Sequence, residues 1–349
     1  MHLTAIPPTR QCLAERVVAR EPDMKLMERA LAILEENGLR AFEIAREVLL
    51  QEEAIAGSVY DALRYFVEES WFDVQHPALS VLACKAVGGN PENVNQVAAS
   101  IVLLAGAADI HDDIVDRSKA KGSRTTVLGR FGENVALLAG DALLFKGLIL
   151  ASNACNALPE NQRGGILELI KRAFFQIGSA EAREVTLRGT YELRPEEYHD
   201  LIEAKAAVSE MSAHIGAVLG GADSEKIGIL RHYGRTLGIL MTIRDDFIDM
   251  FEPDELKNRA ENECLPLPIL YALQDTARKD RVIQILSRPT IGEQDIKEML
   301  DLVMESKEVK ALIEWMKLRI IQEEITLERL NEHGSSTFKL LLRATLEDL

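Results

Sequence analysis

The stretch VAASIVLLAGAADIHDDIVD, residues 97–116, is nearly apolar as far as Ile110 and becomes acidic at its end. A second run, residues 237–243, is similarly apolar. Helices that are apolar nearly all round must lie inside a large bundle. Apolar residues recur at three- and four-residue spacing along most of the chain, and alternating β-branched runs bounded by turn residues are absent from the sequence. The sequence therefore predicts an all-α fold, a single large helical bundle.

The length of the chain, 349 residues, is sufficient for a large core. No tandem repeat, low-complexity tract or linker rich in Pro, Gly and Ser divides it. We therefore expect one all-α domain over residues 21–349, preceded by a loosely ordered stretch over residues 1–20.

Composition argues against several classes of protein. The chain carries 40 Lys and Arg against 56 Asp and Glu, a net charge of −16, which would repel nucleic acid. The longest nearly apolar run, residues 97–108, is shorter than the roughly 18 to 20 residues of a membrane span, and no signal pattern opens the chain. The four cysteines are scattered, which favours reduced thiols. We expect a cytoplasmic protein with no transmembrane segment and no nucleic-acid partner.

Both apolar runs lead into the same acidic pattern, D-D-x-x-D. On a helix, positions i and i+4 share a face, so the carboxylates of each cluster point into one space. Such crowded charges either form a solvated helix end or hold cations, and hard oxygen ligands at this spacing suit Mg²⁺. Two clusters of identical spacing favour the second interpretation, a pair of carboxylate sets that clamp a diphosphate through Mg²⁺. The predicted ligands are Asp112, Asp113 and Asp116, with Asp245, Asp246 and Asp249.

The sequence resembles the polyprenyl synthetase family, the trans-isoprenyl diphosphate synthases, in segments 111–116, 131–144 and 244–249. The resemblance extends over about residues 25 to 330. It implies a helical bundle around a central cavity, three Mg²⁺ ions with a bound diphosphate, and a homodimer, with a heteromer as the alternative. It also implies that an allylic prenyl diphosphate condenses with isopentenyl diphosphate.

The resemblance further assigns diphosphate binding to four basic residues. Lys121 and Arg124 follow the first cluster, where relatives carry Arg-Arg-Gly-x-Pro-Thr. Lys205 keeps the lysine of a Lys-Thr pair. Lys257, or Arg259 in its place, stands where relatives carry Gly-Lys. Thr242 replaces a Gln and is a possible substrate contact.

The largest departure from the family is WFDVQHP, residues 71–77, where relatives carry Gly-Gly-Lys-x-x-Arg-Pro and bind isopentenyl diphosphate. Each missing cationic donor removes a charge-assisted hydrogen bond of roughly 1.5 to 3 kcal/mol. His76 is a possible substrate contact when protonated, and a cap or packing residue is the alternative.

Product length is predicted from two small residues. Ala107 and Ala108 precede Asp112 by four or five positions, about 6 to 7.5 Å along one helix. If they line the cavity beneath the metal site, the chain-length tunnel is deep and the product is C20 or longer. Close packing between helices is the alternative explanation for small residues there.

Three functions are compatible with these features. The leading hypothesis is a Mg²⁺-dependent prenyltransferase that elongates an allylic diphosphate with isopentenyl diphosphate. The missing contacts around residue 75 allow a second, a class I terpene synthase-like enzyme or a prenyltransferase that uses another acceptor. The third is a regulatory subunit of a heteromeric prenyl synthase.

Overall fold

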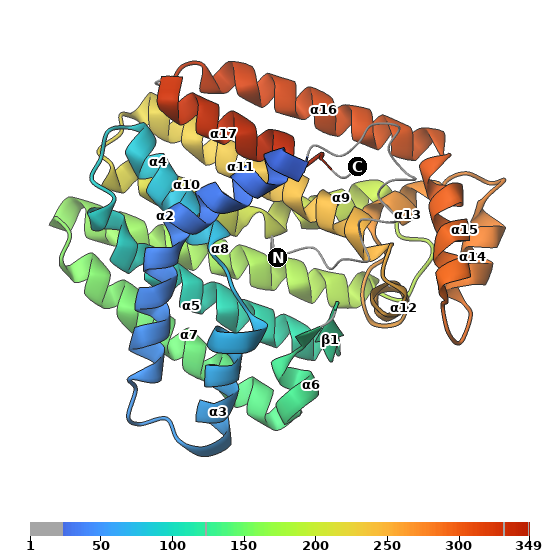
Figure 1. Cartoon of the computed structure of the whole chain (residues 1–349), viewed down its shortest axis with the longest axis horizontal. Helices are drawn as coiled ribbons and strands as arrows, with labels where there is room; N and C mark the ends of the chain where they lie inside the picture. The colour runs from blue at the N-terminus through green and yellow to red at the C-terminus, as the bar shows by residue number, and fades with distance from the viewer. Residues whose placement is uncertain (1–23, 123, 331, 348) are drawn as a thin grey trace.

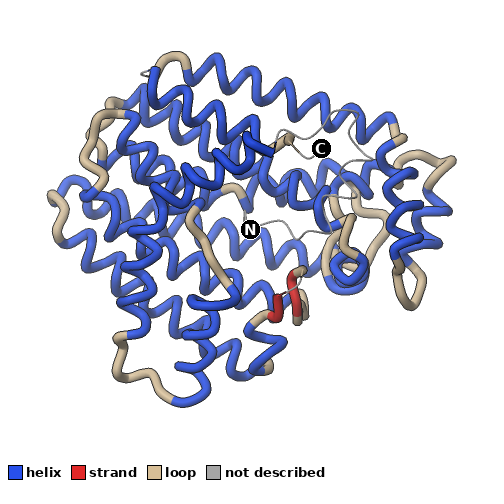
Figure 2. The backbone as a smooth tube through the Cα atoms, in the orientation of Figure 1, coloured by secondary structure: helices blue, strands red, loops and turns tan. Residues whose placement is uncertain are grey.

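The structure, a computed structural model, describes residues 24–122, 124–330, 332–347 and 349. The prediction for residues 1–20 lies outside this range. The prediction of an all-α fold is confirmed, since helices make up nearly all of the regular structure in the described residues (Figures 1 and 2). One two-stranded hairpin, in which Ala120 pairs with Thr125 and Lys121 with Arg124, is the exception among them.

The N-terminal half of the described chain contains α2 (Met24–Leu50), α3 (Gly57–Tyr65), the π-helix η1 (Phe66–Ser70), α4 (Gln75–Ala86), α5 (Glu92–Val115), β1 (Ala120–Lys121), β2 (Arg124–Thr125), α6 (Val127–Phe131), α7 (Glu133–Asn156) and α8 (Glu160–Leu187). The C-terminal half contains α9 (Pro195–Lys205), α10 (Ala207–Leu219), α11 (Ser224–Asp249), α12 (Pro253–Asn262), α13 (Leu267–Ala272), α14 (Lys279–Leu286), α15 (Glu293–Met304), α16 (Lys307–Leu327) and α17 (Glu332–Ala344).

The two helices that precede the acidic clusters are the inner helices of the bundle, as their apolar sequences predict. Nearly every residue of α5 from Val94 to Ala107 is buried, and α5 packs along α7, α2 and α4. Helix α11 is buried from Thr236 to Arg244 and packs on α10. Each fully buried Leu or Ile contributes about 1.5 to 3 kcal/mol of transfer free energy, so the core holds these two helices firmly.

Close helix contacts need residues without a Cβ. A Cβ on Gly216 of α10 would lie 2.0 Å from the carbonyl oxygen of Ser80 in α4. The side chain of Asp223 caps α11 by accepting from the backbone N–H of Lys226 at 2.9 Å. Packing and capping together fix where α11 begins and where its acidic end points.

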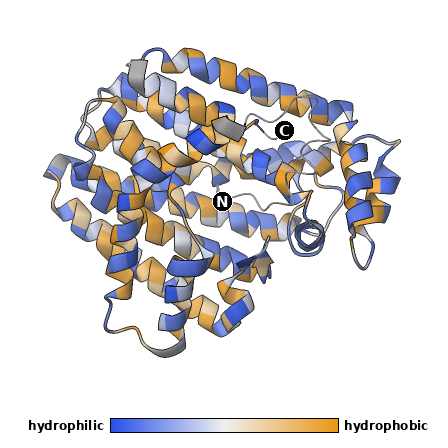
Figure 3. Ribbon diagram, viewed as in Figure 1, coloured by the Kyte–Doolittle hydropathy of each residue, from blue (hydrophilic) through white to orange (hydrophobic). Residues whose placement is uncertain are grey.

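Helix α12 and the hairpin β1–β2 lie at the same end of the bundle (Figure 1). Asn258 of α12 donates to Ser118, which precedes β1, at 3.0 Å. Helix α12 is almost entirely hydrophilic, whereas outer helices such as α16 mix hydrophobic and hydrophilic residues (Figure 3). Leu256 anchors α12 in the hydrophobic core, while most of its other side chains are polar.

Helix α7 is apolar on both its inner and outer faces. Among the described residues, it is the one helix whose length and composition would suffice to cross a membrane, although only 39% of its most apolar window is buried. Its long exposed apolar side chains are Leu137, Leu138, Phe145, Leu148 and Ile149. Exposed apolar surface on this scale indicates a face that contacts another surface.

Candidate active site

The first acidic cluster lies where α5 ends. The backbone N–H of Asp116 still donates to the carbonyl of Asp112 at 2.8 Å, which keeps the last carboxylate in helical register with the first. Lys121 reaches back from β1, with Nζ 2.8 Å from Asp113 Oδ1 and 3.7 Å from Asp112 Oδ2. The structure therefore brings one predicted diphosphate-binding residue to the predicted metal ligands.

The second acidic cluster lies at the end of α11. Asp246 is buried, while Asp245 and Asp249 are half-buried. Asp246 Oδ1 accepts from the guanidinium of Arg259 at 2.7 Å and from the hydroxyl of Tyr198 at 3.2 Å. Its Oδ2 accepts from the backbone N–H of Leu267 at 3.0 Å. Asp246 is thus fully hydrogen-bonded by the protein itself.

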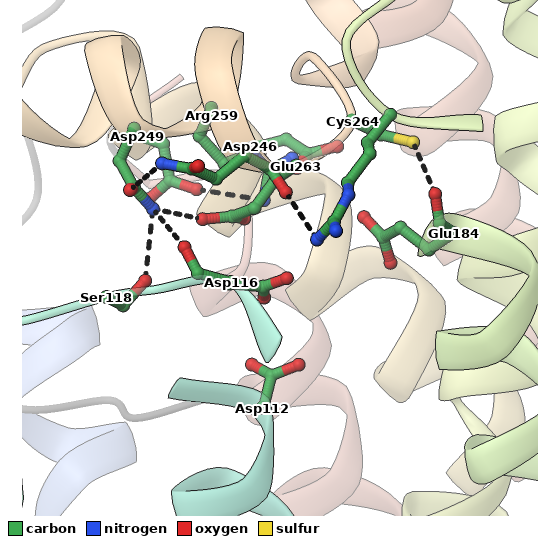
Figure 4. Close-up of polar contacts among 12 residues, drawn as sticks. Asp112, Asp116, Ser118, Glu184, Asp246, Asp249, Arg259, Glu263 and Cys264 are labelled. Carbon is green, nitrogen blue, oxygen red and sulfur yellow. Dashed lines mark hydrogen bonds and ion pairs between the residues drawn. The ribbon is translucent and has the colours of Figure 1, made fainter. Parts of the chain in front are cut away.

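Helix α12 connects the two clusters (Figure 4). The side-chain amide of Asn258 donates to the carbonyl of Asp116 at 3.4 Å and to Glu263 Oε1 at 2.6 Å. Arg259 forms ion pairs with Asp249 at 3.5 Å and with Glu263 at 3.4 Å. The ends of α5 and α11 therefore face one another across a network of α12 side chains.

Helix α8 supplies a further acidic wall. Lys205, at the end of α9, lies 3.0 Å from Glu181 and also forms an ion pair with Glu184. In Figure 4, Glu184 lies on the α8 side of the same space as Asp112 and Asp116. Lys205 thus lies beside this acidic wall, and its role toward a diphosphate stays a prediction.

Burial, with some mutual repulsion, raises the pKa of several carboxylates in the site. Burial raises the pKa of Asp116 to about 9, with repulsion from Asp112 and Glu263 adding to it. Burial likewise raises the pKa of Glu181 to about 8 and that of Asp113 to about 6, although neighbouring lysines oppose both shifts. The site has more negative charge than its own cations neutralise, which is the electrostatic condition for binding divalent cations.

The donor set fits Mg²⁺ if phosphate oxygens complete the coordination. Within the described ranges, no three or more His, Cys, Asp or Glu side chains converge closely enough to hold an ion by themselves. Mg²⁺ commonly binds through one or two carboxylates together with substrate phosphates, so such a cage is not required. No hydrogen-bond donor in the described chain reaches the buried Oδ1 of Asp112, which leaves that oxygen available as a ligand.

Three other predicted residues lie outside this network. Arg124 is exposed on β2. Lys257 donates to the carbonyl of Arg288 at 2.7 Å and pairs with Glu261 at 2.9 Å, so its ammonium is engaged away from the aspartates. The buried hydroxyl of Thr242 donates to the carbonyl of Gly238 at 3.0 Å within its own helix. Their roles toward a substrate stay predictions.

His76 lies in the first turn of α4 and is held by Asp73. The Asp73 carboxylate lies 2.7 Å from His76 Nδ1, and its other oxygen accepts from the backbone N–H groups of Gln75 and His76 at 2.9 and 3.2 Å. Asp73 therefore caps α4, and the N-terminal N–H groups of this helix already bind an internal anion.

Aromatic side chains surround this segment and contact α5. Trp71 stacks on Phe66 with ring centroids 4.8 Å apart, and its indole N–H donates to Asp109, one turn before the first cluster. A Cβ on Gly106 would lie 2.9 Å from the ring of Phe66. Ala107 is buried and Ala108 is half-buried. Close packing explains why position 106 is glycine, and the chain-length role of the two alanines stays a prediction.

The sequence alone missed several of these residues. Tyr198, Asn258 and Glu263 lie outside the D-D-x-x-D pattern and reach the site through α9 and α12. The three-residue spacing of Glu181 and Glu184 places both on one side of α8, where Lys205 of α9 pairs with them, but it gives no signal for Tyr198, Asn258 or Glu263.

Comparison with known proteins identifies the family. The model of the polyprenyl synthetase family matches residues 75–303, more than half of the chain. The chain therefore belongs to the polyprenyl synthetase family.

Two similar proteins are named as diphosphate synthases. The chain is 31% identical over 219 residues to the short chain isoprenyl diphosphate synthase of Methanothermobacter thermautotrophicus, covering 59% of this chain and 64% of that one. It is 31% identical over 211 residues to the geranylgeranyl diphosphate synthase of Methanosarcina mazei, covering 59% and 63%. The matches thus span somewhat less than two thirds of these relatives.

The fold also matches solved structures of the family. The geranylgeranyl pyrophosphate synthetase of Pyrococcus horikoshii aligns with a TM-score of 0.78 at 23% identity, over 91% of this chain and 98% of the other. A polyprenyl synthase of Caulobacter crescentus, solved with calcium and isoprenyl diphosphate, aligns with a TM-score of 0.75 at 20% identity, over 91% and 97%. At these identities the likeness concerns the fold.

Proposed function

We propose that the protein is a Mg²⁺-dependent trans-prenyltransferase that condenses an allylic prenyl diphosphate with isopentenyl diphosphate to give a polyprenyl diphosphate of C20 or longer. The observation that carries the proposal is the excess of buried carboxylates where α5, α11, α8 and α12 meet. The names of these two relatives support the activity.

The residues of the first cluster would hold the ions that bind the leaving diphosphate. Oδ1 of Asp112 is buried and accepts no hydrogen bond from the described residues, and Lys121 lies beside this carboxylate. Bound Mg²⁺ would neutralise the diphosphate and stabilise it as a leaving group. In the reaction, the allylic C–O bond breaks with both electrons going to diphosphate, the double bond of the acceptor forms the new C–C bond, and a proton is lost.

Product analysis tests this function. The enzyme is incubated with Mg²⁺ and C10, C15 or C20 allylic diphosphate, each with and without isopentenyl diphosphate, and all products are analysed by mass. We expect longer diphosphates only when isopentenyl diphosphate is present. Release of diphosphate without elongation would contradict the proposed acceptor, and no release at all would contradict the proposed chemistry.

A second candidate function has support in segment 71–77. Asp73 places a carboxylate at the start of α4, where it is hydrogen-bonded to the backbone N–H of Gln75 and to the His76 ring. A negative charge at that point disfavours a second diphosphate and favours an acceptor without phosphate, or cyclisation of the allylic cation. The same incubations separate the candidates, because either alternative gives diphosphate release and a product that has not gained an isopentenyl unit.

We further propose that the protein is a cytoplasmic homodimer joined through the apolar faces of α7 and α8. Phe175 of α8 is 73% exposed and lies on a helix that packs beside α7. A membrane or a catalytic homologue are the alternative partners for this surface, the latter if the chain is a regulatory subunit. Sedimentation of the pure protein tests the proposal: a dimer supports it, and a monomer at micromolar concentration contradicts it.

A further inference from the structure

Arg259 is placed among the second set of predicted metal ligands (Figure 4). Its guanidinium lies 2.7 Å from Asp246 and 3.5 Å from Asp249, and its side chain is only 11% exposed. Glu263, the residue that follows α12, lies 3.4 Å from the guanidinium and completes a ring of three carboxylates around one cation. A guanidinium cannot lose its proton in a protein, so this positive charge is permanent.

Asp246 has little remaining capacity for a metal ion. Both of its oxygens already accept hydrogen bonds, one from Arg259 and Tyr198 and the other from the backbone of Leu267. An ion that binds Asp246 would have to displace the guanidinium, which would leave a buried cation without its partners. The backbone bond to Leu267 also fixes the carboxylate in its present orientation.

The first cluster differs, because its carboxylates are not all occupied by hydrogen bonds from the protein. Asp112 Oδ1 is buried without a hydrogen-bond donor in the described chain. The cation beside it, Lys121, is 46% exposed on a short hairpin strand and contacts Asp112 only at 3.7 Å. A lysine with this freedom can make way for a metal ion or follow a diphosphate, whereas Arg259 is enclosed on all sides by its partners.

We propose that Arg259 is a resident cation of the second aspartate cluster, so that Asp246 ligates no metal ion and the guanidinium stands in for one. The inference rests on the proposed function, because it describes how the same diphosphate site is neutralised. It revises the three-ion arrangement that the family resemblance implies. Arg259 Nε is buried and has no hydrogen-bond partner among the described residues.

Counting bound ions tests the proposal directly. Mn²⁺ replaces Mg²⁺ and inorganic pyrophosphate serves as the ligand, and free Mn²⁺ is measured by electron paramagnetic resonance. We expect Arg259→Gln to bind one more Mn²⁺ per chain than the wild type, because Asp246, Asp249 and Glu263 lose their shared cation and pyrophosphate oxygens can complete the coordination of an ion in its place. Arg259→Lys keeps the charge and should match the wild type. Equal counts in the wild type and Arg259→Gln would overturn the proposal.

Arg281→Gln is the matched control, because it removes an arginine from a remote ion pair with Glu298. Its Mn²⁺ count should equal that of the wild type. If Arg259→Gln does not fold, Asp246→Asn decides instead. We expect Asp246→Asn to leave the count unchanged while Asp112→Asn lowers it by at least one ion. An equal loss in both variants would overturn the proposal.

These counts are separable from the proposed function. Diphosphate release from a C15 allylic diphosphate by the wild type is measured in parallel. If the wild type releases diphosphate but Arg259→Gln binds no more Mn²⁺ than the wild type, the proposed function stands and the proposed role of Arg259 is overturned. A wild type that releases none overturns the proposed function, and the pyrophosphate counts still decide whether Arg259 excludes an ion.

Discussion

Lys121 Nζ lies 2.8 Å from Asp113 Oδ1, so the strand that follows α5 returns a cation to the carboxylates at the end of that helix. The contact is made possible by the short hairpin, whose second strand is fixed by the hydroxyl of Tyr65 donating to the carbonyl of Thr125 at 2.6 Å. The hairpin therefore positions a charged side chain beside the predicted metal ligands.

Replacing this lysine should weaken use of the allylic diphosphate. We expect Lys121→Gln to lower kcat/KM about 10- to 100-fold, which corresponds to the roughly 1.5 to 3 kcal/mol of a charge-assisted hydrogen bond. Arg124→Gln, which changes the exposed cross-strand neighbour of Lys121, is the comparison. If both substitutions reduce kcat/KM equally, the hairpin contributes general positive charge and the contact of Lys121 is not specific.

Asp116 should make the metal-free protein sensitive to alkaline pH. Burial raises its pKa from 3.8 to about 9, so its contribution to stability is full below the unfolded-state pKa and is lost as pH rises through about 9. Asp116→Asn removes this titration. In EDTA we expect its melting temperature to exceed that of the wild type by a margin that grows between about pH 6 and pH 9. A variant that is less stable than the wild type at about pH 9 would contradict the shift.

The hydroxyl of Tyr198 should stabilise the second cluster. It donates to Asp246 at 3.2 Å in buried surroundings and accepts from Arg259 at 2.8 Å in partly buried ones. Removing it in Tyr198→Phe should cost about 1 to 3 kcal/mol in the free energy of unfolding, measured by urea titration. Tyr191→Phe loses only an exposed contact to Ser287 at 3.4 Å and should differ little from the wild type. Equal losses would indicate a generic effect of removing a phenol.

Gly140 leaves space for the histidine that precedes the first cluster. A Cβ at this position would lie 2.6 Å from His111 Nε2. We expect Gly140→Ala to displace His111 and with it Asp112, at a cost of about 1 to 3 kcal/mol in stability and with lower turnover.

Gly165 is the matched control for this substitution. It lies within α8 and a Cβ there would meet nothing within 4 Å, so Gly165→Ala should be neutral or stabilising by about 0.5 to 1 kcal/mol. A Gly140→Ala variant as stable and active as Gly165→Ala would show that the crowding at His111 is relieved without consequence.

Local pattern explains how much of the site the sequence could predict. The apolar runs before Asp112 and Asp245 predicted buried helices, and the structure brings the two acidic ends together as expected. Periodicity says nothing about which polar helix lies over such ends. The contribution of α12 depends on tertiary packing, so the bridging role of Asn258 had no signal in the sequence.

The choice between Lys257 and Arg259 illustrates the same limit. Two residues apart on a helix, their side chains point about 200° apart, so only one can face the aspartates. Lys257 faces the carbonyl of Arg288 and Arg259 faces Asp246. The sequence made both Lys257 and Arg259 candidates for the site. The rotation of α12 about its own axis decides which side chain faces the aspartates, and local sequence does not encode that rotation.

The most direct test of the central claim is the release of diphosphate from a C15 allylic diphosphate, measured with and without Mg²⁺. We predict Mg²⁺-dependent release by the wild type that falls at least 100-fold in Asp112→Asn, about 2.7 kcal/mol in transition-state stabilisation. Asp61→Asn, an exposed aspartate on α3, should retain wild-type release. Release that is independent of Mg²⁺, or undiminished in Asp112→Asn, would contradict the account.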